Sequence, residues 1–261
     1  MPKIITEDMI EQAAIKALHE RHDYTVLNCM TEEPDTLPDG TGRKDKKQVV
    51  LLDVMLESLC RINPDIPEQT VRTVVDELCR TPVSGDLMLT NYQNYQKIRN
   101  GITVEYNKNG KKTSNILRLL SYNDDLSNTF TVASQMWIKG ETHWRRPDLI
   151  IFINGFPLVF IELKNSNIPV KNAYDINLKN YLKDIPYLFN YNQICVLSNG
   201  METRLGSFAA GYEFFFEWLK VENEKENPDR KAIRENCTSL EYFIAGLCEP
   251  KNLLDYIENF I

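Results

Sequence analysis

The sequence predicts an α/β (α+β) fold in which helices flank a mixed central sheet. Three observations lead to this prediction: an amphipathic helix opens the chain, short apolar segments separated by turn residues fill positions 102–163, and a helix and another strand-like run follow them. With 261 residues, 43% of them hydrophobic, the chain can bury one large core or two small ones. The sequence has no internal repeat, and we expect residues 1–261 to form a single domain.

The opening helix is expected over residues 6–21, because apolar side chains recur there at helical spacing and Thr6 suits the position before the first turn. Residues 31–47 are polar and rich in proline and glycine, which predicts a mobile loop. The apolar stripe of the helix consists of Met9, Ile10, Ala13, Ala14, Ala17 and Leu18.

A helical insertion is expected near residues 30–100. It would carry two amphipathic helices near 48–61 and 67–80, and a third near 86–98 that ends at Asn100-Gly101. A meander of strands then follows, and residues 171–185 are helical again. The sequence ends with another strand and with aromatic helical segments. The expected strands are ITVEY, KTSNILRLLSY, FTVASQMWI, DLIIFI, PLVFIEL and QICVLSN.

Composition excludes several classes of protein. No apolar run is long enough for a membrane helix and no signal peptide is visible, so we expect a cytoplasmic protein with reduced, mostly buried thiols. His19 and His22 have the i, i+3 spacing of some metal ligands, but no third ligand is near, so we interpret them as ordinary surface histidines. The sequence lacks the GxxxxGK[ST] phosphate loop. The six cysteines are Cys29, Cys60, Cys79, Cys195, Cys237 and Cys248.

The most informative segment is RRPDLIIFINGFPLVFIELKNSN, which places Asp148, Glu162 and Lys164 at the outer ends of an apolar hairpin. Other acid-x-Lys triplets occur in the chain, but they lie in polar stretches where charges are solvated. Burying charge at the end of the strand PLVFI is costly unless the charge is paired or binds a metal. The segment therefore indicates either a site or an ion pair that closes the edge of a sheet.

The turn of this hairpin decides between the two. A two-residue Asn154-Gly155 turn would place Asp148 opposite Ile161, and Glu162 would then lie on the other face of the sheet. A three-residue loop with a bulge, with Gly155 in the left-handed conformation, shifts the pairing by one residue and brings the two carboxylates together. The site therefore requires a bulged turn.

Paired carboxylates with a neighbouring lysine have a specific chemistry. Two acids at short distance repel each other unless a cation lies between them, and Mg²⁺ prefers such oxygen ligands. The carbonyl of Leu163 is a third candidate ligand. Lys164, on the same face, would orient water and stabilise charge on a phosphate.

This segment resembles the Asp-x(n)-Glu-x-Lys signature of the PD-(D/E)xK nuclease superfamily. More narrowly, RPD, an apolar strand, NG.P and IELK are similar to the N-terminal endonuclease domain of the R (restriction) subunit of type I restriction–modification systems. The resemblance extends upstream through TEDMIEQAAIKALHERHDYTVLN and NTFTVASQMWIKG, and downstream through IPYLFNYNQICVLSNG and GSFAAGYEFFFEW. It covers most of the chain outside residues 30–100.

The resemblance implies roles for individual residues. Asp148 and Glu162 would be the metal ligands and Lys164 the catalytic lysine. The opening helix of the family often supplies one more acid, for which Glu11 is the best match and Glu7 the second; the alternative is that Glu11 is a solvated helix residue. Relatives often carry Gln-x-x-x-Tyr after the lysine, and here Tyr181 matches while Asn177 replaces the Gln, which puts its reach in doubt.

The resemblance also implies partners. The expected function is Mg²⁺-dependent hydrolysis of double-stranded DNA without sequence readout at the cut, in a complex with modification and specificity subunits. ATP would serve only a motor domain, which this chain lacks, and we expect the chain to be an N-terminal fragment of a longer one. Delivery of DNA by a motor would reconcile a nuclease with the net charge of −7. The alternatives are a non-catalytic DNA-binding or docking module of the same fold and a stand-alone repair-type nuclease.

Overall fold

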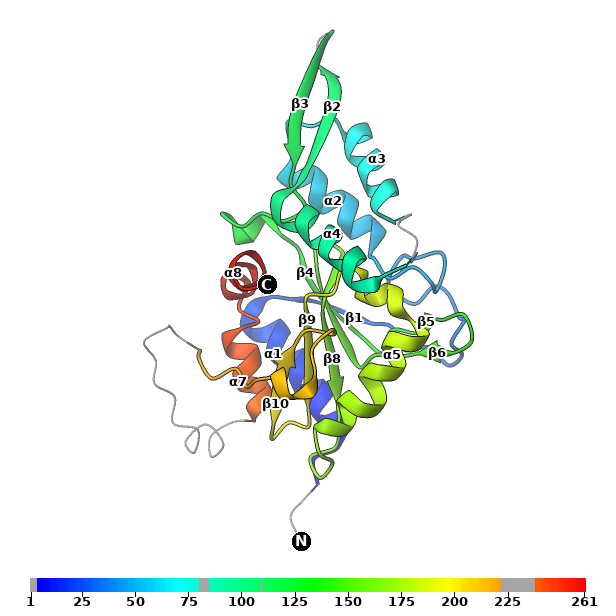
Figure 1. Cartoon of the computed structure of the whole chain (residues 1–261), viewed down its shortest axis with the longest axis vertical. Coiled ribbons are helices and arrows are strands. Elements are labelled where there is room, and N and C mark those ends of the chain that lie inside the picture. The colour runs from blue at the N-terminus through cyan, green and yellow to red at the C-terminus, as the bar shows by residue number, and fades with distance from the viewer. Residues whose placement is uncertain (1–3, 80–84, 109, 222–237) are drawn as a thin grey trace.

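A six-stranded mixed sheet forms the centre of the computed structural model, which describes residues 4–79, 85–108, 110–221 and 238–261 (Figure 1). The strand order is β1-β4-β7-β8-β9-β10, with β1 parallel to β4, β8 parallel to β9 and the other neighbours antiparallel. The predicted mixed sheet is thereby confirmed. Its strands are β1 (Thr25–Asn28), β4 (Phe130–Ser134), β7 (Leu149–Ile153), β8 (Phe156–Leu163), β9 (Ile194–Ser198) and β10 (Thr203–Gly206).

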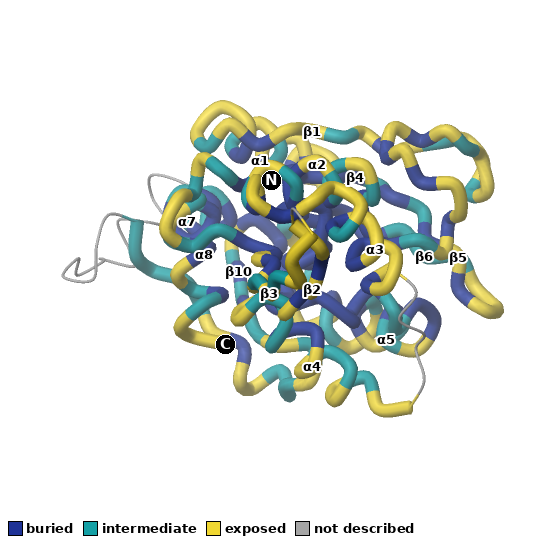
Figure 2. Tube along the Cα trace, turned by 90° about the horizontal axis from the view of Figure 1, so that it is seen from above, coloured by how far each residue is buried: buried dark blue, intermediate teal, exposed yellow. Residues whose placement is uncertain are grey.

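The inner strands are buried on both faces, which explains their unbroken apolar runs (Figure 2). One face packs against α1 (Glu7–His22), α7 (Ser239–Gly246) and α8 (Pro250–Asn259). The other packs mostly against one continuous stretch of chain, together with Val49, Leu51 and Phe215. That stretch comprises the π-helix η2 (Ala173–Leu178), α5 (Lys179–Asp184) and the 3₁₀-helix η3 (Pro186–Asn190).

Helix α1 starts where the sequence predicts, with the Thr6 side chain accepting a hydrogen bond from the Met9 amide at 3.4 Å. The predicted apolar stripe is only partly correct. Met9 is 47% exposed and Ala13 is exposed, whereas Glu11 is only 5% exposed. The buried face of the helix is therefore rotated toward Glu11. Its apolar members are Ile10, Ala14 and Leu18.

Three helices lie in the region for which we predict an insertion, although the division into a core and an insertion remains a prediction. They are α2 (Leu52–Ile62), α3 (Glu68–Cys79) and α4 (Leu87–Asn100), and α4 ends before Gly101 as expected. The next two segments, β2 (Ile102–Lys108) and β3 (Lys111–Leu117), pair only with each other and project with α2 and α3 at one end of the molecule (Figure 1). They are strands, as predicted, but the expectation that they belong to the same meander as the central strands is wrong.

The polar segment 31–47 is a loop, as predicted, but buried ion pairs anchor it. Asp39 accepts hydrogen bonds from Arg43 Nε at 2.9 Å and from Lys46 Nζ at 2.8 Å, and all three side chains are almost completely buried. Burial alone would raise the pKa of Asp39, but these two cations lower it to about 2. Buried charges need their partners, so the loop cannot detach from the protein without breaking or exposing the ion pairs of Asp39 with Arg43 and Lys46.

Several short elements are absent from the sequence prediction. The unexpected elements are the strands β1 and β10, the two-stranded sheet of β5 (Ile138–Lys139) and β6 (Trp144–Arg145), and the 3₁₀-helices η1 (Asp125–Ser127) and η4 (Tyr212–Phe214). Elements of two to four residues carry too little periodicity to be recognised. Residues 222–237, part of the region for which we predict the final helical segments, lie outside the described residues.

Three sequence-based exclusions bear on the described residues. None of their helices is long and apolar enough to cross a bilayer. The described cysteines are free thiols, but Cys79 is exposed rather than buried, and Cys237 lies outside the described residues. His19 and His22 hydrogen-bond the backbone carbonyls of Tyr24 and Ile244, as structural histidines do.

The β7–β8 hairpin contains the predicted shift in register, but at a different place. Ile153 pairs with Phe156 across a two-residue turn in which Asn154 and Gly155 have φ of 49° and 81°. Phe152 then pairs with Pro157 and Ile151 with Val159, which leaves Leu158 as the extra residue of a bulge inside β8. The predicted three-residue loop is therefore wrong, because the turn is tight and the bulge lies within the strand.

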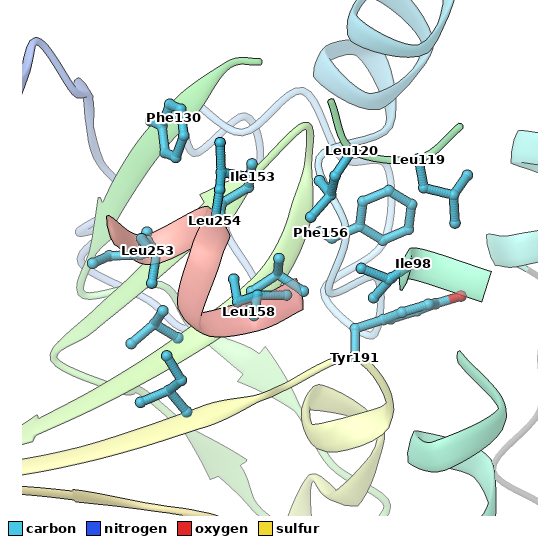
Figure 3. Packing of buried hydrophobic residues seen from close by; sticks show 14 of the residues in the cluster. Ile98, Leu119, Leu120, Phe130, Ile153, Phe156, Leu158, Tyr191, Leu253 and Leu254 are labelled. Carbon is cyan, nitrogen blue, oxygen red and sulfur yellow. The ribbon is translucent and has the colours of Figure 1, made fainter. Parts of the chain in front are cut away.

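The bulge has two consequences for the sheet. The Leu158 side chain joins the apolar cluster beneath α8, together with Leu254 (Figure 3). Beyond the bulge, Leu149 pairs with Ile161, so that Asp148 lies opposite Glu162. The carboxylates share the face of the sheet required by the site prediction.

The tight turn gives a first testable prediction. A Cβ on Gly155 would lie 2.5 Å from the Leu51 carbonyl, whereas a Cβ on Gly110, which has a φ of 78°, would meet no atom within 4 Å. Gly110→Ala should lower the free energy of unfolding by about 1 kcal/mol through backbone strain alone. Gly155→Ala should lower it by about 3 kcal/mol, because overpacking adds to that strain. Urea unfolding measures both, and equal losses would contradict the packing described for the turn.

Candidate active site

All side chains that the sequence analysis proposes for the site line one cleft of about 500 Å³. The cleft lies where β7 begins and where β4 and β8 end, between the first turns of α1 and the η2–α5 segment. It brings together side chains that are up to 174 residues apart in the sequence, from Glu7 to Tyr181. Those singled out from the sequence are Glu7, Glu11, Asp148, Glu162, Lys164, Asn177 and Tyr181.

Asp148 and Glu162 are held rigidly by the sheet. Asp148 is 7% exposed and its Oδ2 accepts a hydrogen bond from the Leu163 amide at 2.7 Å. Burial raises the pKa of Asp148 to about 6, and this hydrogen bond opposes the rise. One oxygen of Asp148 is therefore fixed by the opposite strand.

Glu162 is the least satisfied group of the site. It is 2% exposed, its Oε1 accepts from Lys164 Nζ at 3.0 Å, and its buried Oε2 has no hydrogen-bond partner among the described residues. Burial raises the pKa of Glu162 well above its ordinary range, and the neighbouring Asp148 adds to this effect. A buried oxygen without a donor favours binding of a cation at this position.

Lys164 lies among oxygen atoms. Its ammonium donates to Glu162 and to the Leu163 carbonyl, and Glu7 Oε2 is 3.7 Å away. Burial alone would lower the pKa of Lys164, but the surrounding carboxylates, Glu162 foremost, outweigh burial and raise it. The lysine is therefore a cation in direct contact with Glu162.

The first turns of α1 are attached to the segment that follows the lysine. The Glu7 amide donates to Asn165 Oδ1 at 2.8 Å, and the Ile5 amide donates to Ser166 Oγ at 3.0 Å. This attachment places Glu11 at the cleft, where burial raises its pKa to about 7. Both acids therefore lie at the site. Glu7 is next to Lys164, and Glu11 accepts a hydrogen bond from Gln135, which also approaches Asp148.

Gln135 is a site residue that the sequence analysis missed. Its Nε2 donates to Glu11 Oε2 and lies 3.4 Å from Asp148 Oδ1, while its amide donates to the Asp148 carbonyl at 2.9 Å. Its φ of 55° is unusual for a residue other than glycine, and such strain is common at functional sites. The only sequence signal is its position directly after the buried strand FTVAS.

Tyr181 and Asn177 approach from the other side of the cleft. Tyr181 is 6% exposed, its ring packs on Phe160 at 5.4 Å, and its hydroxyl donates to the Arg146 carbonyl at 3.1 Å. Burial raises the pKa of Tyr181, and the neighbouring Glu162 and Asp148 raise it further, so it remains a donor. Asn177 lines the cleft from η2, and π-helical turns often occur at functional sites.

The family model described as type I restriction enzyme R protein N terminus (HSDR_N) matches residues 4–236. The chain belongs to this family. It is 35% identical over 267 residues to the type I restriction enzyme HindI endonuclease subunit of Haemophilus influenzae, covering 99% of this chain and 24% of that subunit.

Two further relatives of this R protein N-terminal family show the extent of the likeness. The putative type I restriction enzyme MjaIXP endonuclease subunit of Methanocaldococcus jannaschii is 29% identical over 275 residues, which cover 99% of this chain and 26% of that subunit. The type I restriction enzyme SauCOLORF180P endonuclease subunit of Staphylococcus aureus is 41% identical over 78 residues, 30% of this chain and 8% of the subunit. The chain spans about a quarter of the length of the first two relatives.

The chemistry of the cleft of this R protein N-terminal domain suits a divalent cation. Among the described residues, no three His, Cys, Asp or Glu side chains form a compact metal-binding group. The donor set is instead two opposed carboxylates and the Leu163 carbonyl, with the free Oε2 of Glu162 between strands. Few protein ligands with room for water are typical of Mg²⁺.

The raised pKa of Glu11 predicts a pH-dependent stability. The native state binds the Glu11 proton up to about pH 7 and the unfolded chain only to its ordinary value of 4.5, so the free energy of unfolding falls as pH rises between these values. Glu11→Gln removes this dependence. The free energy of unfolding of the variant, measured relative to wild type, should therefore increase by about 1–2 kcal/mol from pH 4.5 to pH 8. Solvent in the cleft keeps this below the full effect of the pKa shift.

Urea unfolding of both proteins at the two pH values measures this gain. A difference in stability between variant and wild type that is the same at both pH values would show that the Glu11 carboxyl does not carry the dependence.

Proposed function

We propose that the chain is a Mg²⁺-dependent DNA endonuclease domain with the PD-(D/E)xK arrangement. The observation that carries the proposal is the placement of Asp148 directly opposite Glu162 with Lys164 Nζ 3.0 Å from Glu162, inside a cleft. Membership of the type I restriction enzyme R protein N-terminal family supports it. The reaction is hydrolysis of a backbone phosphodiester, in which water attacks phosphorus and the bond to a sugar oxygen breaks.

In this proposal Asp148, Glu162 and the Leu163 carbonyl hold the metal. A bound Mg²⁺ would supply Lewis-acid stabilisation of the phosphate and lower the pKa of water. The same ion would neutralise two carboxylates whose pKa values are raised by burial, and the partnerless Glu162 Oε2 would be one of its ligands. The metal therefore offsets the cost of burying two acids side by side.

Lys164 is the proposed catalytic lysine. Its ammonium donates hydrogen bonds to Glu162 and to the Leu163 carbonyl, and these two groups would also bind the metal. With those oxygens engaged by a cation, the donors of Lys164 would be available to water and to a phosphate oxygen. In the structure Glu7 Oε2 lies 3.7 Å from its ammonium. It would orient the water and stabilise charge that develops on the phosphate.

The remaining lining residues would position these groups. Gln135 connects Glu11 to Asp148 and would fix both carboxylates. Tyr181 would hold the wall of the cleft through the Arg146 carbonyl, and Asn177 would contact DNA or order the site. The described lining contains no group that we expect to read a base.

Partners follow from the family. The substrate would be double-stranded DNA, the assembly would include modification and specificity subunits, and an ATP-driven motor outside residues 1–261 would deliver the DNA. A net charge of −7 is compatible with delivery by a motor, because long-range attraction of DNA is then unnecessary.

Substitution at the core of the site tests this function. Asp148→Asn and Lys164→Ala should each reduce DNA cleavage by on the order of 10²–10³-fold or more, because each removes a group that stabilises the transition state. Lys171→Ala, at an exposed lysine 57% accessible and outside the cleft, is the matched control. Cleavage of circular plasmid DNA is measured with the chain alone, and also with these residues joined to the motor and assembled with modification and specificity subunits and ATP. Undiminished cleavage by either site variant would end the assignment.

Metal binding can be tested without cleavage. Mg²⁺ or Mn²⁺ should raise the melting temperature of the wild-type chain, because a ligand that binds the native state stabilises it. The free energy of unfolding should rise by about 2–3 kcal/mol at a hundredfold excess of metal over Kd. Glu162→Gln should lose this response, while the exposed-site variant Glu20→Gln should keep it. A response that survives in Glu162→Gln would place the metal elsewhere.

A further inference from the structure

The cleft carries an excess of negative charge, which any DNA phosphate must overcome. Five of its lining residues are Asp or Glu and only two are Lys or Arg, namely Lys164 and Arg146. A metal held by Asp148 and Glu162 would neutralise two of the acids and leave three. DNA, a polyanion, can approach such a surface closely only where a free cation meets its backbone.

Lys164 is not free to serve as that cation. Its ammonium is in contact with Glu162, the Leu163 carbonyl and Glu7, and its side chain is 15% accessible. Its chemistry is directed at the reacting phosphate. The backbone on either side of the cut therefore needs another positive group.

Arg146 is that other group. Its guanidinium makes no hydrogen bond or ion pair to the described residues, and its neighbour Arg145 is different in this respect, since Arg145 Nε donates to Asp184 Oδ2 at 2.7 Å. Two adjacent arginines thus have separate tasks: Arg145 closes the strand β6 onto α5, while Arg146 lines the cleft.

The position of Arg146 is fixed from two sides. Its guanidinium stacks over the Trp137 ring at 4.8 Å, and its carbonyl accepts the Tyr181 hydroxyl at 3.1 Å. Pro147 follows it and Asp148 comes next, so its backbone is tied to the start of β7. A guanidinium that stacks on an aromatic ring keeps its N–H edge available, and this planar fork fits a phosphate with two parallel hydrogen bonds.

We propose that Arg146 binds a non-bridging oxygen pair of a DNA backbone phosphate next to the one that is cut. Trp137 holds the guanidinium in place, and Arg146 determines where the duplex lies relative to Asp148 and Glu162. This inference rests on the proposed nuclease function and adds a residue that positions the substrate. It concerns binding, so it can be tested apart from cleavage.

The test is DNA affinity as a function of salt. A fluorescein-labelled duplex is titrated with the protein in Ca²⁺ across a series of NaCl concentrations, and anisotropy gives Kd. Arg146→Gln should weaken binding on the order of tenfold at about 0.1 M salt. It should also lower the magnitude of the slope of log Kd against log salt by about 0.9, the value for one lost phosphate contact. Arg21→Gln, an exposed position on α1 outside the cleft with the same loss of charge, should change neither quantity.

Arg146→Lys separates charge from packing. It should keep the wild-type salt slope, because the charge remains, and bind severalfold more weakly, because one ammonium replaces the two-pronged fork. Four outcomes would each overturn the proposal. Arg146→Gln could behave like wild type or have no more effect than Arg21→Gln. Arg146→Lys could bind as weakly as Arg146→Gln, or the wild-type chain could show no measurable binding. Circular dichroism of the variants checks that they are folded.

The two proposals fail separately. Lys164→Ala tests cleavage, whereas Arg146→Gln tests DNA affinity. A wild-type affinity and slope for Arg146→Gln beside inactive Lys164→Ala would refute only the role of Arg146. A chain that binds DNA through Arg146 but never cuts it would refute only the nuclease function.

Discussion

The register between β7 and β8 is the constraint on which the site depends. Side chains alternate between the faces of a sheet, so a slip of one residue would move Glu162 away from Asp148. The bulge at Leu158 sets that register, and the tight Asn154-Gly155 turn fixes the hairpin on the other side of it. Asn154 is fully buried, and its side-chain oxygen accepts the Thr129 amide at 2.8 Å, so the turn cannot relax to another length without losing contacts in the core.

The rest of the fold supports this pairing at some cost. Leu158 fills the core beneath α8, α1 is joined to the segment after Lys164, and the η2–α5 segment closes the opposite wall with Tyr181. The result is a rigid cleft in which three acids have raised pKa values, namely Glu11, Asp148 and Glu162. Such a cluster destabilises the protein at neutral pH unless cations meet it, which is a common property of catalytic sites.

Much of this arrangement could be predicted from sequence, because it is encoded locally. Helix periodicity located α1 to α4, and the apolar runs located β4, β7, β8 and β9. The RPD and IELK patterns pointed to the acids and the lysine. The place of the bulge could not be read, because Pro157 and Leu158 suit a regular strand edge as well as a bulge, and the choice is made by packing against α8. Gln135 and Arg146 acquire their surroundings from distant segments, so no local pattern marks them.

A bulge, and not the turn, aligns Asp148 with Glu162, and we propose that the two carboxylates bind one cation there. The decisive experiment is a crystal structure grown with Mn²⁺ and recorded for anomalous scattering. We expect an anomalous peak between these two carboxylates, with Lys164 beside it, Ile153 paired with Phe156 and Leu158 unpaired. Regular pairing through Leu158, with the carboxylates on opposite faces and no peak between them, would contradict this proposal.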